Sequence, residues 1–122
     1  MIIAVDFDGV LCESQFPRIG PSDQEMIQAV KRVQNAGHET VLWTCRADQR
    51  LSEAVEWCEM HGLHFTSIND NTSSNKLLFS ATYPNGTRKV FADVYIDDRN
   101  LGYTRRAAIC FLNEIARLTH KE

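Results

Sequence analysis

The sequence predicts an α/β fold: a doubly wound parallel sheet with helices on both faces. The continuous apolar run at residues 1–5 is typical of a strand buried on both faces, and further strands are predicted at 40–44, 92–96 and, more weakly, 64–68. Segments with apolar residues at helical spacing follow three of these predicted strands. Strands that alternate with helices of about ten to fifteen residues indicate βαβ units, whose strands pair in parallel.

Composition is that of an ordinary globular chain and limits the function classes. The 122 residues are 43% hydrophobic and 24% charged, so we expect one domain over residues 1–122. The net charge of −3 argues against non-specific nucleic-acid binding. No apolar run approaches the roughly 18 residues of a membrane span, and the start lacks the basic region of a signal peptide. We therefore expect a cytoplasmic protein with no membrane partner, whose four cysteines are reduced thiols.

The first helix is predicted directly after a loop over residues 9–21, which contains prolines and glycine. Ser22 is the expected N-cap, and Glu25 would complete a capping box. Gly37 is expected to end the helix in the C′ position. The apolar face of this helix comprises Met26, Ile27, Val30 and Val33.

Two further helices are predicted. Asp48 would cap the second, and Gly62 would end it. Residues 69–88 are rich in Asn, Ser, Thr and Gly and are expected to be mostly loop. The last helix should run from about Thr104 to His120. The apolar faces are Leu51, Ala54, Val55 and Cys58 in the second helix, and Ala108, Phe111, Leu112 and Ile115 in the last.

Polar residues follow the predicted strands at one edge of the sheet. In open α/β sheets, ligands bind beyond the carboxyl ends of the strands. The residues that the sequence places there are Asp6, Asp8, Thr44, Asn69, Asp70, Asp97 and Asp98. Two acidic clusters, each closing an apolar strand, would therefore approach one site.

Crowded carboxylates resist ionisation unless a cation offsets them. Asp6 and Asp8 stand two apart and can address one site, and Asp97 and Asp98 would reach it from another strand. Magnesium is the hard, oxygen-binding divalent ion that suits such a set, and it also attracts phosphate. The simpler interpretation is that these are solvated acids in loops after strands.

Three motifs carry a resemblance to a known family. "DFDGV" at residues 6–10 resembles the first motif of the haloacid dehalogenase superfamily, most of whose members are phosphatases. "VLWT" at 41–44 resembles its second motif, and "VYIDD" at 94–98 resembles its fourth. The similarity extends from residue 1 to about residue 102. It implies a Rossmann-like fold and a magnesium-dependent phosphatase.

The resemblance assigns catalytic and metal-binding roles. Asp6 resembles the nucleophile, which would form an aspartyl-phosphate. Asp8 resembles the general acid/base for the leaving oxygen and for the hydrolytic water. Magnesium would be held by the Asp6 carboxylate, the Asp8 backbone carbonyl and one acid of the final pair. Asp98 is favoured as the direct ligand, and Asp97 would orient the ligands.

The resemblance also implies a phosphate-binding group composed of Thr44, Cys45, Arg46 and Lys89. Thr44 would hydrogen-bond the phosphoryl oxygens through its hydroxyl, helped by nearby backbone N–H groups. Lys89, just before the fourth motif, would balance charge on the phosphoryl group and on Asp6. Lys76 competes with Lys89 for this role. Arg46 could grip phosphate bidentately, and a surface salt bridge is the equal alternative.

The sequence departs from most of the family because it has no room for a cap domain. Only about a dozen residues separate the first motif from its helix, and only about twenty lie between the third predicted strand and Lys89. This resembles the capless branch of the superfamily. An open site suits a macromolecular phosphate, or a small phosphorylated substrate covered by a neighbouring subunit of a homo-oligomer.

We therefore expect a phosphoric monoester hydrolase that acts through an aspartyl-phosphate. One alternative is a phospho-accepting receiver domain, which also combines aspartates, Thr and Lys around magnesium. Receivers place the acidic pair after the first strand, whereas here the adjacent pair comes last. The other alternative is a catalytically idle binding module on this fold.

Overall fold

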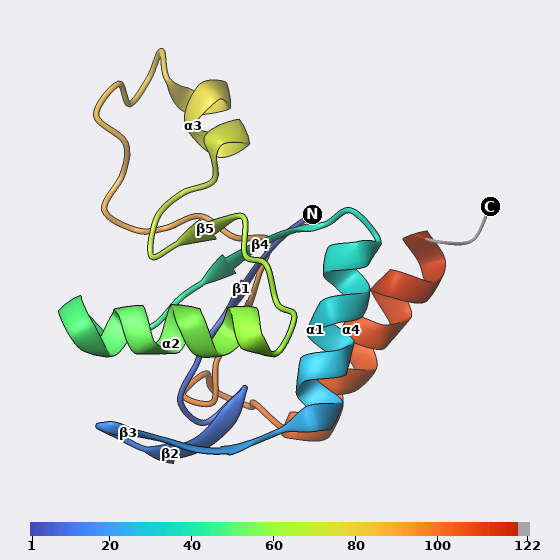
Figure 1. The fold of residues 1–122 in the computed structure, drawn as a ribbon. Helices are drawn as coiled ribbons and strands as arrows, with labels where there is room; N and C mark the ends of the chain where they lie inside the picture. The colour runs from blue at the N-terminus through green and yellow to red at the C-terminus, as the bar shows by residue number, and fades with distance from the viewer. Residues whose placement is uncertain (120–122) are drawn as a thin grey trace.

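A four-stranded parallel sheet forms the centre of the computed structural model, which describes residues 1–119 (Figure 1). The strand order is β5-β4-β1-β6. The chain thus adds strands on one side of β1 and then returns to the other side, so β1 and β6 end side by side. The predicted α/β fold with a parallel sheet is confirmed. The strands are β1 (Ile2–Val5), β4 (Glu39–Leu42), β5 (Ser67–Ile68) and β6 (Val94–Ile96).

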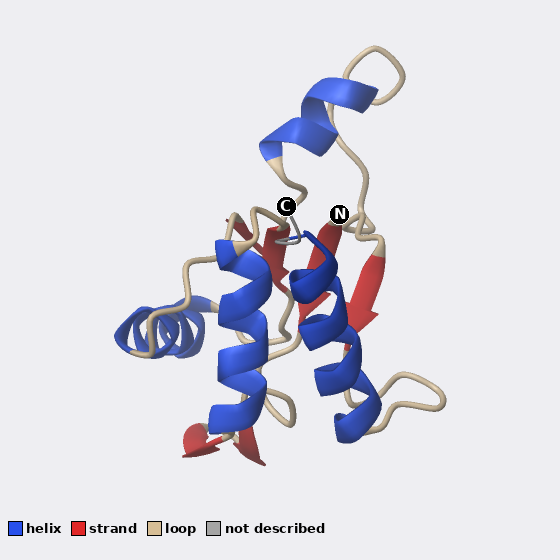
Figure 2. Ribbon diagram, turned by 90° about the vertical axis from the view of Figure 1, so that its right-hand side faces the viewer, coloured by secondary structure: helices blue, strands red, loops and turns tan. Residues whose placement is uncertain are grey.

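Three helices cover one face of this sheet. Ile3 and Val5 of β1 join one buried cluster with apolar side chains of all three helices. Figure 2 shows α1 and α4 side by side in front of the sheet. The predicted apolar face of the first helix is buried in full, whereas Leu51, Val55, Phe111 and Ile115 of the other two predicted faces are only half-buried. The helices are α1 (Gln24–Asn35), α2 (Asp48–Met60) and α4 (Arg105–Thr119).

The opposite face is covered differently from the expectation of helices on both faces. Ala4 and Val41 pack there against Val90 and Ala92, which lie in the extended chain before β6. The short helix α3 (Ser73–Phe79) has no buried residue and projects from the body (Figures 1 and 2). Its apolar residues Leu77, Leu78 and Phe79 are exposed, so α3 adds no helical layer to this face of the sheet.

Within the segment 69–88, which was expected to be mostly loop, α3 is an additional helix. Its N-cap is Thr72, whose hydroxyl accepts a hydrogen bond from the backbone N–H of Asn75 at 3.3 Å. The predicted strand over 64–68 is also shorter than expected, because only β5, Ser67–Ile68, pairs with β4. Thr72 is thus a helix-capping signal in the sequence that was not recognised.

A β-hairpin replaces the predicted loop over residues 9–21. Its strands are β2 (Cys12–Gln15) and β3 (Arg18–Ser22), and they pair antiparallel. The prolines and glycine that favoured a loop are accommodated within it: Pro17 lies in the turn, and Gly20 faces the backbone carbonyl of Glu13. A Cβ at Gly20 would lie 2.3 Å from that oxygen.

The predicted C-terminal ends of α1 and α2 agree with the structure, whereas their predicted N-caps differ; α4 begins at Arg105, next to the predicted Thr104. Gly37 and Gly62 adopt positive φ, of 94° and 79°, directly after α1 and α2, as predicted. The N-cap of α1 is Asp23 rather than Ser22. Asp48 is the first residue of α2, and the N-cap, Ala47, makes no side-chain cap. The predicted end of the last helix at His120 lies outside the described residues.

Asp23 is the residue that fixes the start of α1. Its Oδ1 accepts from the backbone N–H of Met26 at 3.1 Å, and Arg105 of α4 donates to both its oxygens, at 2.6 and 2.9 Å. These contacts hold the pKa of Asp23 below its usual value, chiefly through the Arg105 hydrogen bond. Asp23 therefore joins α1 to α4.

Within residues 1–119, no helix has the length and apolarity that a membrane crossing requires.

Asp23→Ala should lower the free energy of unfolding by about 1–2 kcal/mol, because it removes the N-cap and leaves Arg105 with one fewer carboxylate. Ser22→Ala, the neighbouring control, should change it by less than about 0.5 kcal/mol. Urea denaturation of both variants measures the difference. A larger loss in Ser22→Ala would return the capping role to Ser22.

Candidate active site

Three carboxylates meet at the carboxyl edge of the sheet. Asp6 follows β1, and Asp97 and Asp98 follow β6. One oxygen from each lies within 4.8 Å of the others. The parallel register aligns Val5 with Ile96, and the backbone N–H of Asp6 donates to the Ile96 carbonyl at 2.9 Å. The convergence that the sequence predicted for these residues is therefore present, and we call them the acid cluster.

Crowding changes the ionisation of Asp6. Burial is the main cause that raises its pKa, from 3.8 to about 8, and the nearby charge of Asp97 raises it further. Asp98 adds to the rise through a hydrogen bond and its own charge. The N–H of Phe7, which donates to Asp6 Oδ1 at 2.8 Å, opposes the rise. At neutral pH and without a cation, Asp6 is therefore mostly protonated.

Gly9 permits the close approach of Asp98, a role that was not predicted from the sequence. A Cβ on Gly9 would lie 2.2 Å from Asp98 Oδ2, and Gly9 has a φ of +87°. Both facts favour glycine, the one residue without a Cβ. The signal was present in the sequence as the glycine directly after "DFD".

Asp8 stands apart from the acid cluster because Arg46 engages its side chain. Arg46 Nε donates to Asp8 Oδ2 at 2.8 Å, and Nη2 donates to Oδ1 at 2.9 Å. The Arg46 side chain is only 1% exposed. Neither sequence interpretation of Arg46, as a phosphate grip or as a surface salt bridge, describes this geometry, which is a buried bidentate ion pair.

Thr44 lies beside the edge, just after β4. Its backbone N–H donates to Asn69 Oδ1 at 2.8 Å, and its hydroxyl oxygen accepts from the Arg46 N–H at 3.1 Å. Asn69 thus holds the strand end that carries Thr44, a role that the sequence did not indicate. Cys45 is exposed. The Thr44 hydroxyl keeps its proton for donation, so its predicted contact with phosphoryl oxygens remains compatible with the structure.

Lys89 is not brought to the acid cluster. Its Nζ lies 5.5 Å from the ring centroid of Tyr95, and Lys76 pairs with Asp70 at 2.7 Å. Both lysines line a cavity of about 730 Å³ between α3 and β6. Among residues 1–119, no ion pair links either lysine to the acid cluster. The reason is topological: Lys89 precedes β6, whereas the acids follow its carboxyl end.

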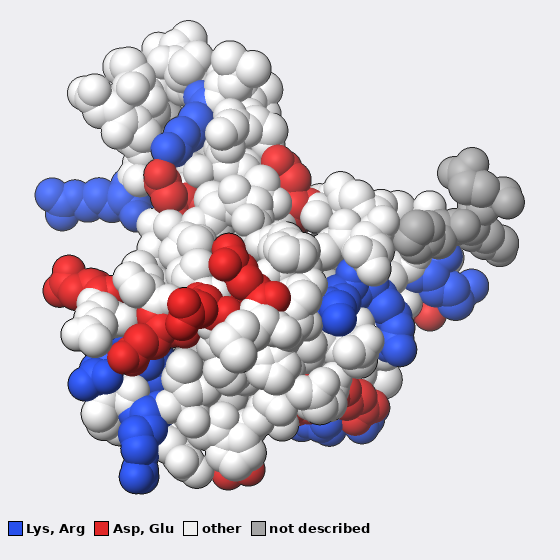
Figure 3. All heavy atoms as spheres, in the orientation of Figure 1, with Lys and Arg blue, Asp and Glu red and all other residues white. Residues whose placement is uncertain are grey.

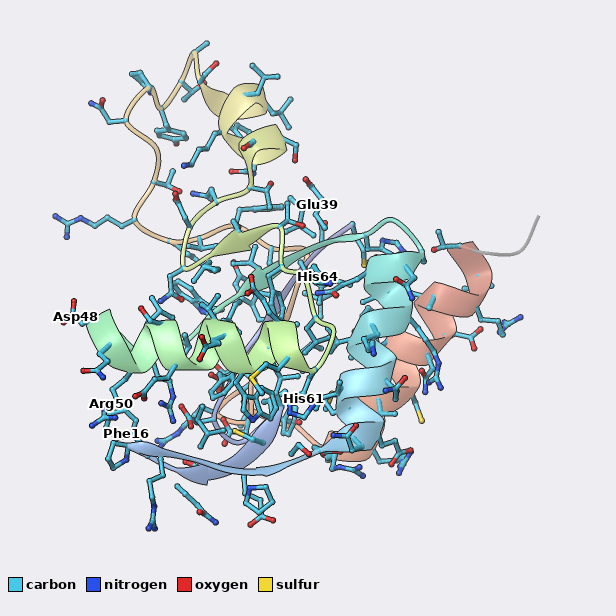
Figure 4. All side chains as sticks on the ribbon, viewed as in Figure 1. Phe16, Glu39, Asp48, Arg50, His61 and His64 are labelled. Atoms are coloured by element: carbon cyan, nitrogen blue, oxygen red, sulfur yellow. The ribbon has the colours of Figure 1, made fainter. Side chains whose placement is uncertain are left out.

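Charge on the surface is also uneven. Figure 3 shows acidic side chains gathered over α2, a helix whose sequence contains Asp48, Glu53, Glu56 and Glu59 against a single base, Arg50. Figure 4 shows Asp48 at the start of α2, with Arg50 and the hairpin residue Phe16 below it. Arg50 pairs with Glu53 at 3.1 Å. This face is distinct from the acid cluster.

Fold and site together define an α/β protein with a candidate cation site at the carboxyl edge of its parallel sheet. Neither protein-family models nor curated proteins give a match. A solved structure, of a conserved protein from Bacteroides thetaiotaomicron, is 33% identical with a TM-score of 0.79. The match covers 99% of this chain and 93% of that one. The chain therefore belongs to the same family as that conserved protein.

The raised pKa of Asp6 predicts how the metal-free protein responds to pH. The unfolded chain loses the Asp6 proton near pH 3.8 and the folded protein near pH 8. Stability from this group is therefore complete below pH 3.8 and is lost as pH rises toward 8. In EDTA, the melting temperature should fall over this interval, and the fall should be smaller in Asp6→Asn. Equal pH dependence of the two proteins would contradict the assignment.

Proposed function

We propose that this protein is a magnesium-dependent phosphatase of the haloacid dehalogenase type, which hydrolyses phosphate monoesters through an aspartyl-phosphate on Asp6. The observation that carries the proposal is the acid cluster. A carboxylate at the end of β1 stands beside an acidic pair at the end of β6. The resemblance of the motifs at 6–10 and 94–98 to that superfamily assigns these same residues to nucleophile and metal binding.

The donor set fits a hard divalent cation. All three ligand groups are carboxylates, with one oxygen of each within 4.8 Å of the others. Such oxygens suit magnesium. Burial is the main cause of the raised pKa of Asp6, the neighbouring Asp97 and Asp98 add to it, and a bound cation would offset the charge of all three carboxylates. Asp6 and Asp98 would hold the ion directly, with the Asp8 carbonyl, and Asp97 would orient them. Once bound, magnesium neutralises charge on the phosphoryl group.

The chain's own residues then divide the reaction into two displacements. An Asp6 carboxylate oxygen attacks phosphorus, and the bond to the leaving oxygen breaks with its electron pair, while Asp8 supplies the proton. Water next attacks the aspartyl-phosphate and gives its proton to Asp8. The phosphorus–oxygen bond to Asp6 breaks, so that phosphate is released and the Asp6 carboxylate is restored. The Thr44 hydroxyl would orient the phosphoryl oxygens throughout.

Charge balance in this site differs from the sequence expectation. Lys89 lies at the cavity near Tyr95, and the Arg46 guanidinium is occupied by Asp8. Neutralisation of the phosphoryl group therefore depends mainly on the cation and on backbone N–H groups.

The hairpin β2–β3 is the element inserted after β1. A hairpin of this size is no cap domain, which supports assignment to the capless branch.

A catalytically idle binding module is the second candidate, and one observation favours it. Arg46 donates to both oxygens of Asp8, so the group that must move protons is already engaged. Such a module would bind phosphate and magnesium without turnover. Release of nitrophenol from p-nitrophenyl phosphate with magnesium distinguishes the enzyme from this alternative.

Asp6→Asn should reduce p-nitrophenyl phosphate turnover to background, because an amide oxygen cannot replace the carboxylate nucleophile. Asp48→Asn is the matched control, since Asp48 is exposed at the start of α2, and it should keep wild-type turnover. Steady-state assays with magnesium measure both. Retention of more than a few per cent of activity in pure Asp6→Asn would remove Asp6 from the nucleophile role.

Magnesium should raise the melting temperature of the wild type, because binding to the folded state stabilises it by mass action. Asp98→Ala should abolish that rise, although loss of a like charge should stabilise the metal-free form. Thermal denaturation across a magnesium titration tests this. An unchanged response in Asp98→Ala would transfer the ligand role to Asp97.

A further inference from the structure

The guanidinium of Arg46 is fixed on several sides. Besides its two bonds to Asp8, Nη1 donates to the Pro17 carbonyl at 3.2 Å and Nη2 donates to the Arg18 carbonyl at 3.0 Å. Its Cζ also lies 5.1 Å from the ring centroid of Phe7 and 5.2 Å from that of Phe16. Asp8 is thus connected, through one buried side chain, to the turn of the hairpin β2–β3.

Stability alone is a poor reason for this arrangement. Burying an ion pair removes both charges from water, and well-packed apolar residues of similar volume often stabilise a protein equally or better. What a bidentate guanidinium supplies is geometry, because its planar donors match a carboxylate in one orientation. Arg46 therefore determines where the Asp8 carboxylate lies relative to Asp6.

We infer that Arg46 is the positioning residue for Asp8 in hydrolysis of the aspartyl-phosphate, an inference that rests on the proposed phosphatase function. Each Asp8 oxygen has two acceptor sites, and Arg46 uses one on each. A free site therefore remains to take the proton from water as its oxygen bonds to phosphorus. The bond from phosphorus to Asp6 breaks, and its electrons return to the Asp6 carboxylate.

The hairpin β2–β3 contributes to the contacts that hold Arg46. Two of its backbone carbonyls and the Phe16 ring contact the guanidinium, so the position of Asp8 depends on the hairpin being closed against Arg46. Thr44 is linked to the same group, because its hydroxyl accepts from the Arg46 N–H. Arg46, in the loop after β4, thus holds the Asp8 carboxylate and donates to the Thr44 hydroxyl.

Pre-steady-state kinetics separates this role from a purely structural one. Nitrophenolate leaves with little need for a proton, so formation of the aspartyl-phosphate should survive the loss of Arg46, whereas its hydrolysis should not. Arg46→Met should give a burst of about one nitrophenolate per active site, followed by steady-state turnover reduced about 100-fold, as expected for a misplaced catalytic group.

Arg117→Met is the matched control, because Arg117 pairs with Glu114 through Nε and Nη2 but lies exposed on α4. It should behave as the wild type. The magnesium-dependent rise in melting temperature should persist in Arg46→Met, which shows that the fold and the acid cluster are intact. If that variant does not fold, Arg46→Lys keeps the buried charge and should show the same burst, with a smaller loss.

Three results would overturn the inference. Burst and steady-state rates could fall together, which would mean that Arg46 supports the site as a whole. Arg46→Met and Arg46→Lys could both turn over as the wild type does. Wild-type protein with magnesium could release no nitrophenolate, in which case the proposed phosphatase function itself fails, and this inference fails with it.

Discussion

The pairing of β1 with β6 is the constraint on which the candidate site depends. Parallel strands end at the same edge, and the register of Val5 with Ile96 places Asp6 beside Asp97 and Asp98. Nothing in the local sequence of either motif requires this proximity. It follows from the order in which the chain builds the sheet, because β6 is added on the free side of β1 after β4 and β5.

The proximity has an electrostatic cost that the fold tolerates. The helices on one face bury Ile3 and Val5 of β1, and burial of Asp6, directly after this strand, is the main cause of its raised pKa. Without a cation, the three carboxylates repel one another, and a bound cation would offset this repulsion. The glycine at position 9 contributes by leaving room for the Asp98 carboxylate. The stability of the metal-free fold and the proposed affinity for a cation are therefore opposed at this edge.

Much of this architecture was predictable, and the exceptions have physical reasons. The parallel sheet and the convergence of the acids were predicted, because parallel strands present their carboxyl ends at one edge; the strand order β5-β4-β1-β6 was not predicted. The hairpin was missed because its strands are short and mostly exposed, and Pro17 and Gly20 read as loop signals. Side-chain partners were not predictable from spacing: Arg46 reaches Asp8, 38 residues away in the chain. Lys89 was expected at the acid cluster because it is close to β6 in the sequence. It precedes the strand, however, and therefore lies at the end opposite to Asp97 and Asp98.

The segment 69–92 contains the part of the protein that can open locally and tolerate sequence change, the short helix α3. Its helix α3 buries no residue, and Leu77 and Leu78 are 77% and 74% exposed. Helices of this length are marginal unless packed, so α3 should open and close without unfolding the sheet, in the manner of local units of low stability. Mutation or insertion within α3 would leave the carboxyl edge of the sheet unaltered, whereas Asn69 supports Thr44 and Val90 and Ala92 cover the sheet. The projecting helix is thus the part of the fold most free to diverge, and new structure can be added there while the acids at the carboxyl edge stay in register.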